Sequence, residues 1–219
     1  MATDSATRAD AELPLRERKK RRTRRALEET ALRLFGERGF DATTLDELVD
    51  EVAISKRTFF RNYASKEDVA MAAEIELWDA YVAEVRGADL HGPVLACLRD
   101  ALVAAVRRLG DDWDRRFVAT RTLVDRTPTL RDRSLLLSVT VQERIVSALE
   151  DKLGLDGRKD MRLWLVGEVS LSAWRCGSKN WVAGRGTVEG GRGQDRTRTL
   201  IRRVEEAFDT IPDSLALCA

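Results

Sequence analysis

A short run of side chains in the first third of the sequence has the chemistry needed to read DNA bases. It comprises Ser55, Lys56, Arg57, Thr58, Phe59, Phe60, Arg61 and Asn62. Arginine can form a bidentate contact with guanine and asparagine the equivalent contact with adenine, while threonine can meet a phosphate or a thymine methyl group. At helical spacing Phe59 faces a small core with Ile54 and Tyr63, which leaves the polar side chains outside or at the rim. The run is therefore predicted to be a base-reading helix.

Two further helices are predicted to position this run. The first covers about residues 23–38, where apolar side chains recur on one helical face before Gly39 ends the helix. The second begins after Thr44, which fits a capping box with Glu47, and Ser55 is a favourable N-cap for the base-reading helix. Two helices joined by a tight turn are the unit that places its second helix in the DNA major groove. Similar shapes occur in proteins that never touch DNA, so the short motif leaves both interpretations open.

The charges of the chain are unevenly distributed. Lysine and arginine number 38 and aspartate and glutamate 37, and a net charge of +1 would by itself argue against a nucleic-acid partner. Residues 16–25, however, contain eight basic residues and one acid. Because they precede the first helix, they are predicted to form a flexible basic arm on phosphates or in the minor groove, with Arg21, Arg22 and Arg25 as contacts. A solvated charged tail is the alternative.

The block from Thr23 to Ala70 resembles the TetR family of transcriptional regulators. The resemblance is carried by the order and spacing of residues 34–40 (LFGERGF), 42–44 (ATT), 54–63 (ISKRTFFRNY) and 65–68 (SKED). It implies an all-α homodimer in which each subunit has a three-helix DNA-binding domain and a larger helical domain for ligand binding and dimerisation. On this basis we expect a flexible arm at 1–22, the DNA-binding domain at 23–70 and the larger domain at 71–219.

The resemblance also implies which residues contact DNA. Those at or near DNA, mostly on phosphates, would be Thr44, Lys56, Thr58, Phe60, Asn62 and Lys66, and those approaching bases would be Arg57 and Arg61. Three positions depart from the usual pattern of the family. Ala53 replaces the turn glycine, so this backbone position lacks glycine's conformational freedom. Arg57 replaces a glycine and adds a candidate base contact, while Phe60 replaces a tyrosine and lacks the hydroxyl that would reach a phosphate.

The remainder of the chain is predicted to be helical, with a glycine-rich flexible connection at 184–193. The expected helices cover about 66–86, 93–109, 112–126, 129–153, 158–182 and 196–211. Two helical faces are candidates for a four-helix bundle between subunits, with packing inside one subunit as the alternative. These faces carry Ser170, Ala173 and Trp174 on one helix, and Ile201, Val204 and Phe208 on the other. Candidates for an effector pocket, which could equally be core or interface residues, are Trp78, Trp113, Phe117, Arg121, Met161 and Trp164.

Other functions fit the sequence less well. The only histidine, His91, lies in a predicted loop, so we expect neither an enzyme nor a metal or other cofactor. No uncharged stretch exceeds nine residues, too short to cross a bilayer, and a cytoplasmic protein is expected. The prediction is a ligand-responsive repressor, a homodimer that binds a palindromic operator in double-stranded DNA and is released by a small, largely apolar effector. The alternative is a helical protein-interaction module with a degenerate DNA-binding domain.

Overall fold

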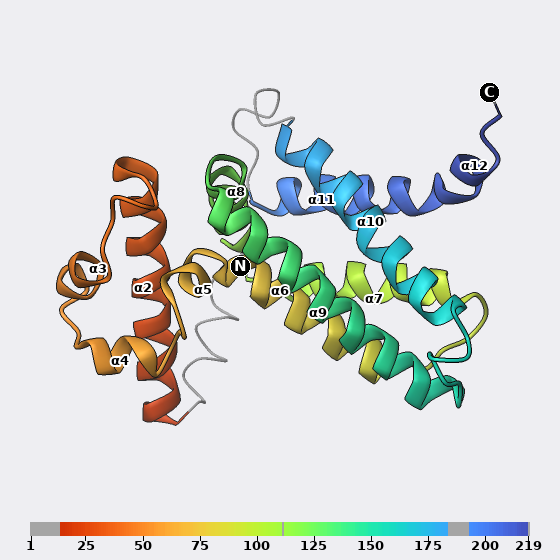
Figure 1. The fold of residues 1–219 in the computed structure, drawn as a ribbon, viewed down its shortest axis with the longest axis horizontal. Helices are drawn as coiled ribbons and strands as arrows, with labels where there is room; N and C mark the ends of the chain where they lie inside the picture. The colour runs from red at the N-terminus through yellow and green to blue at the C-terminus, as the bar shows by residue number, and fades with distance from the viewer. Residues whose placement is uncertain (1–13, 111, 184–192, 219) are drawn as a thin grey trace. The chain divides into compact units, whose positions relative to one another are not determined.

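The computed structural model describes residues 14–110, 112–183 and 193–218 (Figure 1). Every regular element in these ranges is a helix, which confirms the predicted all-α fold. The helices are α2 (Leu15–Arg38), α3 (Leu45–Glu51), α4 (Lys56–Phe60), α5 (Lys66–Ala70), α6 (Ala72–Gly87), α7 (Val94–Arg108), α8 (Trp113–Arg126), α9 (Pro128–Leu153), α10 (Arg162–Ala183), α11 (Gly193–Asp209) and α12 (Ile211–Leu215). The helix predicted over 66–86 is therefore interrupted at Met71. The connection predicted at 184–193 lies, except for its last residue, outside the described residues.

The chain forms two compact units. The first contains the described residues up to Glu74 together with Arg115–Arg133. The second contains Ile75–Asp114 and the described residues from Ser134 onward. The segment that completes the first unit is distant in sequence from the helix-turn-helix, so packing rather than chain order assigns it there.

Helix α2 begins earlier than the sequence predicted. It starts at Leu15, directly after Pro14, whereas the apolar periodicity placed its start near Thr23. Residues 15–22 are therefore an exposed helical extension and not part of a flexible arm, while residues 1–13 of the predicted arm lie outside the described residues. Lysine and arginine are good helix formers, but a fully exposed helix has no apolar stripe by which its start could be recognised.

The helix-turn-helix is supported by a small apolar core within the first unit. The apolar face of α2, formed by Leu27, Ala31, Leu34 and Phe35, is no more than 1% exposed at any of these positions. Phe59 of α4 is also fully buried, as its predicted inward orientation requires. Burying side chains of this size contributes about 1.5–3 kcal/mol each, so the core holds the exposed face of α4 in a defined direction.

Local hydrogen bonds fix the starts of α3 and α4. The Glu47 N–H donates to Thr44 Oγ1 (3.2 Å) and the Thr44 N–H donates to Glu47 Oε2 (2.8 Å), which confirms the predicted capping box. These bonds with Thr44 hold the pKa of Glu47 below its usual value. Likewise, the Thr58 N–H donates to Ser55 Oγ (3.1 Å) and caps α4. In the turn between the helices Ala53 has a φ of 54°, a left-handed conformation that costs an alanine about 1–2 kcal/mol.

In the second unit, α10 and α11 pack against each other and α7 packs against both. Gly177 permits a close approach, because a Cβ at this position would lie 2.7 Å from the Arg203 carbonyl oxygen and 2.9 Å from Val204 Cα. The six residues predicted to pair with a second subunit are each 9% exposed or less in the single chain, namely Ser170, Ala173, Trp174, Ile201, Val204 and Phe208. These side chains pack within one subunit, which was the alternative, and they offer little surface to another.

Two features of the described residues bear on other functions. None of their helices is long and apolar enough to span a bilayer. No group of three or more histidine, cysteine, aspartate or glutamate side chains among them could hold a metal ion.

Candidate nucleic-acid interface

Helix α4 presents cations and an aromatic ring on a buried support. Phe59 forms the support, and the ring of Phe60 lies edge-on to it with the centroids 5.4 Å apart. Phe60 is itself 56% exposed. The exposed cations of this segment are Lys56, Arg57 and Arg61. Guanidinium and ammonium groups bind phosphates and base edges, and an exposed ring can contact a sugar or thymine methyl group, so this surface suits nucleic acid.

The three cations differ in how readily they could reach DNA. Lys56 Nζ lies 2.5 Å from Asp46 Oδ1 of α3, and both side chains are more than half exposed. An exposed ion pair of this kind is worth at most about 1 kcal/mol, so a phosphate could replace the carboxylate. Within the described residues the guanidinium groups of Arg57 and Arg61 form no ion pair. Unlike Lys56, these two arginines have no carboxylate partner among the described residues to exchange for DNA, and base reading by both remains a prediction.

Asn62 and Thr58 are turned partly toward the protein. Asn62 Nδ2 donates to the Thr58 carbonyl oxygen (2.7 Å), and the Thr58 hydroxyl lies 3.0 Å from Ser55 Oγ. Asn62 Oδ1 is buried and has no hydrogen-bond partner among the described residues. The amide of Asn62 would have to rotate away from the helix end to contact adenine, so its predicted role in base reading requires a rearrangement.

Two other predicted DNA contacts have structural roles of their own. Lys66 Nζ donates to the carbonyl oxygens of Phe40 (2.8 Å) and Thr43 (2.9 Å) and lies 4.2 Å from the centroid of the Phe40 ring. It therefore fastens the start of α5 to the loop before α3. The Thr44 side chain is exposed, but its hydroxyl already lies 2.9 Å from Glu47 Oε2 in the capping box.

The basic segment lies on one continuous helix with the core face of α2. Arg21 and Arg22 are exposed on the helical extension, whereas Arg25 is half-buried and its Nε lies 3.2 Å from Glu29 Oε1. Burial, followed by the charge of neighbouring Arg116, lowers the pKa of Arg25. A rigid helix can present its cations only on fixed sides, so the extension can contact phosphates along its length but cannot wrap around DNA as a flexible arm would.

A buried polar network behind α4 was not identified from the sequence. Tyr63 Oη donates to Glu28 Oε1, and Arg116 Nη1 of α8 donates to Glu28 Oε2 (2.8 Å). All three residues are less than 10% exposed. Burial, and next the adjacent Glu28 carboxylate, raise the pKa of Tyr63 above its usual value. No sequence signal pairs Glu28 with Arg116, because 88 residues separate them.

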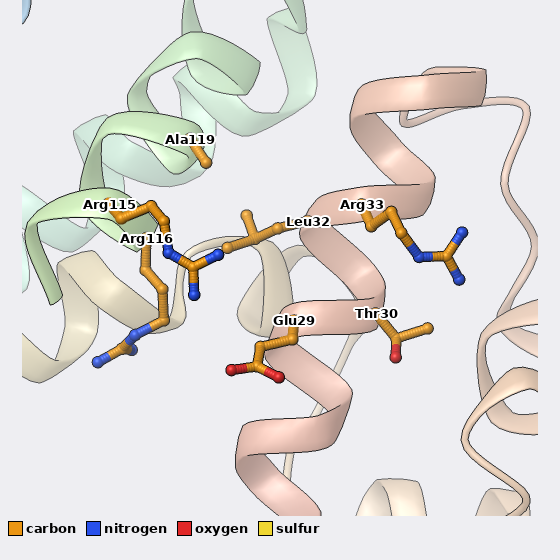
Figure 2. Close-up of a pocket in the computed structure, with 7 residues that line it drawn as sticks. All are labelled: Glu29, Thr30, Leu32, Arg33, Arg115, Arg116 and Ala119. Carbon is orange, nitrogen blue, oxygen red and sulfur yellow. The ribbon is translucent and has the colours of Figure 1, made fainter. Parts of the chain in front are cut away.

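A pocket of about 610 Å³ lies in the first unit where α2 and α8 face each other (Figure 2). It is lined by Glu29, Thr30, Leu32, Arg33, Arg115, Arg116 and Ala119. In Figure 2 the Arg115 side chain extends from α8 toward α2, whereas Arg33 points away from α8. None of the residues predicted to bind an effector lines this pocket.

The predicted effector residues are divided between the two units. The first unit contains Phe117 and Arg121, and the second contains Trp78, Trp113, Met161 and Trp164. Trp78, Trp113 and Phe117 are buried, and Arg121 Nη1 lies 3.3 Å from Glu74 Oε2. Met161 and Trp164 are 72% and 38% exposed. An effector pocket built from these side chains remains a prediction.

Comparison with known proteins places this arrangement among bacterial regulators. Residues 27–73 match the family described as bacterial regulatory proteins, tetR family. Over 206 residues the chain is 29% identical to the HTH-type transcriptional regulator TcmR of Streptomyces glaucescens, covering 92% of this chain and 86% of that protein. It is 23% identical to the mycofactocin biosynthesis transcriptional regulator MftR of Mycobacterium tuberculosis, described as putative, over 89% of this chain and 91% of that one. Among solved structures, Salmonella enterica GusR is 16% identical over 85% of this chain and 95% of its own, with a TM-score of 0.45.

Proposed function

Because this chain belongs to the TetR family of bacterial regulatory proteins, we propose that it is a ligand-responsive repressor that binds a palindromic operator as a homodimer. Its relatives are transcriptional regulators and not enzymes. The observation that carries the proposal is the exposed surface of α4 and its C-cap, where Arg57, Phe60 and Arg61 lie over the buried Phe59. Binding to chromosomal DNA implies that the protein acts in the cytoplasm.

A homodimer would place two copies of α4 about one DNA turn, roughly 34 Å, apart, and the symmetry of the protein would match that of the operator. Exposed apolar side chains support a contact between subunits. Leu135, Leu136 and Val139 of α9 are 59%, 61% and 53% exposed. Large clusters of exposed apolar side chains are uncommon on a monomer, so a partner is expected to cover these. We place a subunit contact here, because the faces of α10 and α11 expected from the sequence are already covered.

A small, largely apolar effector would release the repressor if it binds better to the dimer whose two α4 helices have the wrong separation. Exposed Met161, which precedes α10, and Trp164, in its first turn, provide apolar surface that such a molecule could cover. The expected consequence is quenching of Trp164 fluorescence during titration with the apolar probe 1-anilinonaphthalene-8-sulfonate. If the quenching is lost in a Trp164→Phe variant, it is assigned to Trp164. If the wild type and Trp164→Phe give identical titration curves, the probe does not bind near Trp164 and the proposed effector site is contradicted.

The DNA-binding part of the proposal is tested with labelled duplexes that tile the DNA flanking the chain's own coding region. Fluorescence anisotropy should find one fragment bound far more tightly than a shuffled duplex of the same composition. Arg57→Ala should weaken binding to this fragment by about 1–3 kcal/mol, which is a decrease in affinity by a factor of roughly 5 to 150. Arg158→Ala is the matched control, because Arg158 is 92% exposed in the second unit and its removal changes the net charge equally.

The helical protein-interaction module remains the second candidate. It predicts that no flanking fragment is preferred over the shuffled duplex and that Arg57→Ala and Arg158→Ala bind DNA equally weakly. Sedimentation equilibrium tests the dimer separately. Leu136→Arg should yield monomers, whereas Asp151→Arg, at an exposed position near the other end of α9, should remain dimeric.

A further inference from the structure

We propose that Arg116 is a positioning residue for α4 and that it acts through the buried Glu28 carboxylate and the Tyr63 hydroxyl. This inference rests on the proposed DNA-binding function but assigns a role to a residue of α8, outside the helix-turn-helix. The DNA-reading helix is then held in place by a segment that the chain contributes many residues later.

The network connects three elements through one carboxylate. Glu28, in α2, accepts from Arg116 Nη1 on one oxygen and from Tyr63 Oη on the other. Tyr63 continues the last turn of α4, because its N–H donates to the Phe59 carbonyl oxygen (3.0 Å). The guanidinium of Arg24 also lies 4.7 Å from the centroid of the Tyr63 ring. The residue that follows the end of α4 is therefore contacted at both its hydroxyl and its ring.

The burial of this network makes it sensitive to geometry. The Arg116 and Glu28 side chains are only 5% and 10% exposed. A buried carboxylate is costly unless its oxygens are paired, and the hydrogen bonds of Glu28 require Arg116 and Tyr63 both to reach it. A shift of α8 that withdrew Arg116 would leave one oxygen of Glu28 without this donor, and the carboxylate would have to move to find another. Such a movement would alter the partner of the Tyr63 hydroxyl.

Other contacts hold α8 and the first turns of α9 within the first unit. Thr120 Oγ1 donates to the Ala70 carbonyl oxygen (2.9 Å), and Arg121 Nη1 lies 3.3 Å from Glu74 Oε2. Arg133 Nη2, in α9, also lies 2.7 Å from Asp68 Oδ1. These contacts end on α5 and α6, whereas the contact of Arg116 leads through Glu28 to α4. Among the contacts described for these four residues, that of Arg116 leads to the DNA-reading helix through a single shared side chain.

A positioning role and a purely stabilising role have different consequences for DNA binding. Phosphate contacts tolerate small changes in the direction of a helix, but base contacts do not. If the network positions α4, its disruption should weaken operator binding and leave binding to a shuffled duplex almost unchanged. If the network only stabilises the fold, well below the unfolding temperature both affinities should stay as in the wild type.

The experiment compares Glu28→Gln with Glu29→Gln in the full-length chain. Glu29 is the adjacent residue of α2, is exposed and forms an ion pair with Arg25, so the same substitution there leaves the network intact. We expect Glu28→Gln to lower operator affinity about tenfold or more at low temperature, with less than a twofold change for the shuffled duplex. Glu29→Gln should bind both duplexes like the wild type.

Two further variants keep the test decisive. Tyr63→Phe removes one hydroxyl and preserves the ring, so it should fold even if Glu28→Gln does not, and it should show the same selective weakening of operator binding. Arg116→Lys should bind the operator more tightly than Arg116→Met, because it restores the charge opposite Glu28. Equal operator affinity in wild type and Tyr63→Phe, or a parallel decrease of operator and shuffled-duplex affinity, would overturn the positioning role.

Hydrogen exchange provides a readout that does not depend on DNA. In Tyr63→Phe and Glu28→Gln, the amides of Phe59 and Tyr63 should exchange faster, while those in the middle of α7 should keep their protection. Unchanged protection at the end of α4 would refute the inference even if an operator had been found. A wild-type chain that prefers no duplex would instead refute the proposed function, and exchange at the same amides in Arg116→Met would still decide the role of Arg116.

Discussion

The close packing of α10 and α11 predicts a large effect from adding one methyl group. In Gly177→Ala the new Cβ would lie 2.7 Å from the Arg203 carbonyl oxygen, about 0.7 Å inside the 3.4 Å at which ordinary contact begins. It would also lie 2.9 Å from Val204 Cα and 3.0 Å from the Arg203 carbonyl carbon. All three atoms belong to the backbone of α11, so no side-chain rotation can relieve the overlap and the two helices must separate.

The expected magnitude follows from two opposing effects. Overpacking of a close-packed contact costs about 1–3 kcal/mol, and the upper end applies because Val204, which is 1% exposed, must move with the backbone. Alanine is favoured over glycine inside a helix by about 1 kcal/mol, which offsets part of this cost. We expect the free energy of unfolding to fall by about 2 kcal/mol, which corresponds to a decrease of about 4–8 °C in the melting temperature of a chain of this size.

The assay is thermal and urea unfolding followed by circular dichroism at several protein concentrations, so that any dissociation of subunits is separated from unfolding. Gly36→Ala is the matched control. Gly36 is also helical, but a Cβ there would meet nothing within 4 Å, so the same substitution should raise stability by about 0.5–1 kcal/mol. The reasoning is refuted if Gly177→Ala is as stable as the wild type or if both variants change in the same direction.

Four further predictions concern the helix-turn-helix and the basic segment. Ala53→Gly should raise the free energy of unfolding, measured in urea titrations, by about 0.5–1 kcal/mol. Glycine removes the cost of a φ of 54°, and the greater entropy of glycine in the unfolded chain offsets part of this gain. A decrease in stability would show that the turn is not strained. The pKa of Glu47 is lower in the folded chain than in the unfolded chain, so the ionised carboxylate stabilises the fold. This stabilisation is fully present above the pKa of the unfolded state and is lost as the pH falls through the lower pKa of the folded state. The melting temperature of Glu47→Gln should therefore fall less than that of the wild type on acidification below about pH 4, and equal decreases would contradict this. Phe60→Tyr should tighten operator binding several-fold in anisotropy titrations by adding a hydroxyl within reach of a phosphate, about 0.5–1.5 kcal/mol, and unchanged affinity would mean that the ring does not approach the backbone. Deletion of residues 1–22 should reduce the slope of log K against log salt by about one unit for each phosphate that the shortened chain no longer binds, whereas an unchanged slope would exclude the segment from the interface.

Features that depend on neighbouring residues were predictable from the sequence. The capping box of Thr44 and Glu47 and the cap at Ser55 form because their partners are three residues away, where helix geometry already fixes the distance. The inward orientation of Phe59 and the buried face of α2 follow from helical periodicity for the same reason. The left-handed conformation of Ala53 lies in the short connection between α3 and α4, at the position where the family resemblance implies a glycine.

Features that depend on distant partners were decided by the tertiary structure alone. Lys66 lies over the loop at Phe40, and Arg116 pairs with Glu28 across 88 residues, so no spacing in the sequence indicates either contact. An apolar stripe shows that a helix face will be covered but does not identify what covers it. The stripes of α10 and α11 are therefore equally compatible with a second subunit and with each other, and the close approach at Gly177 shows that within this chain they cover each other.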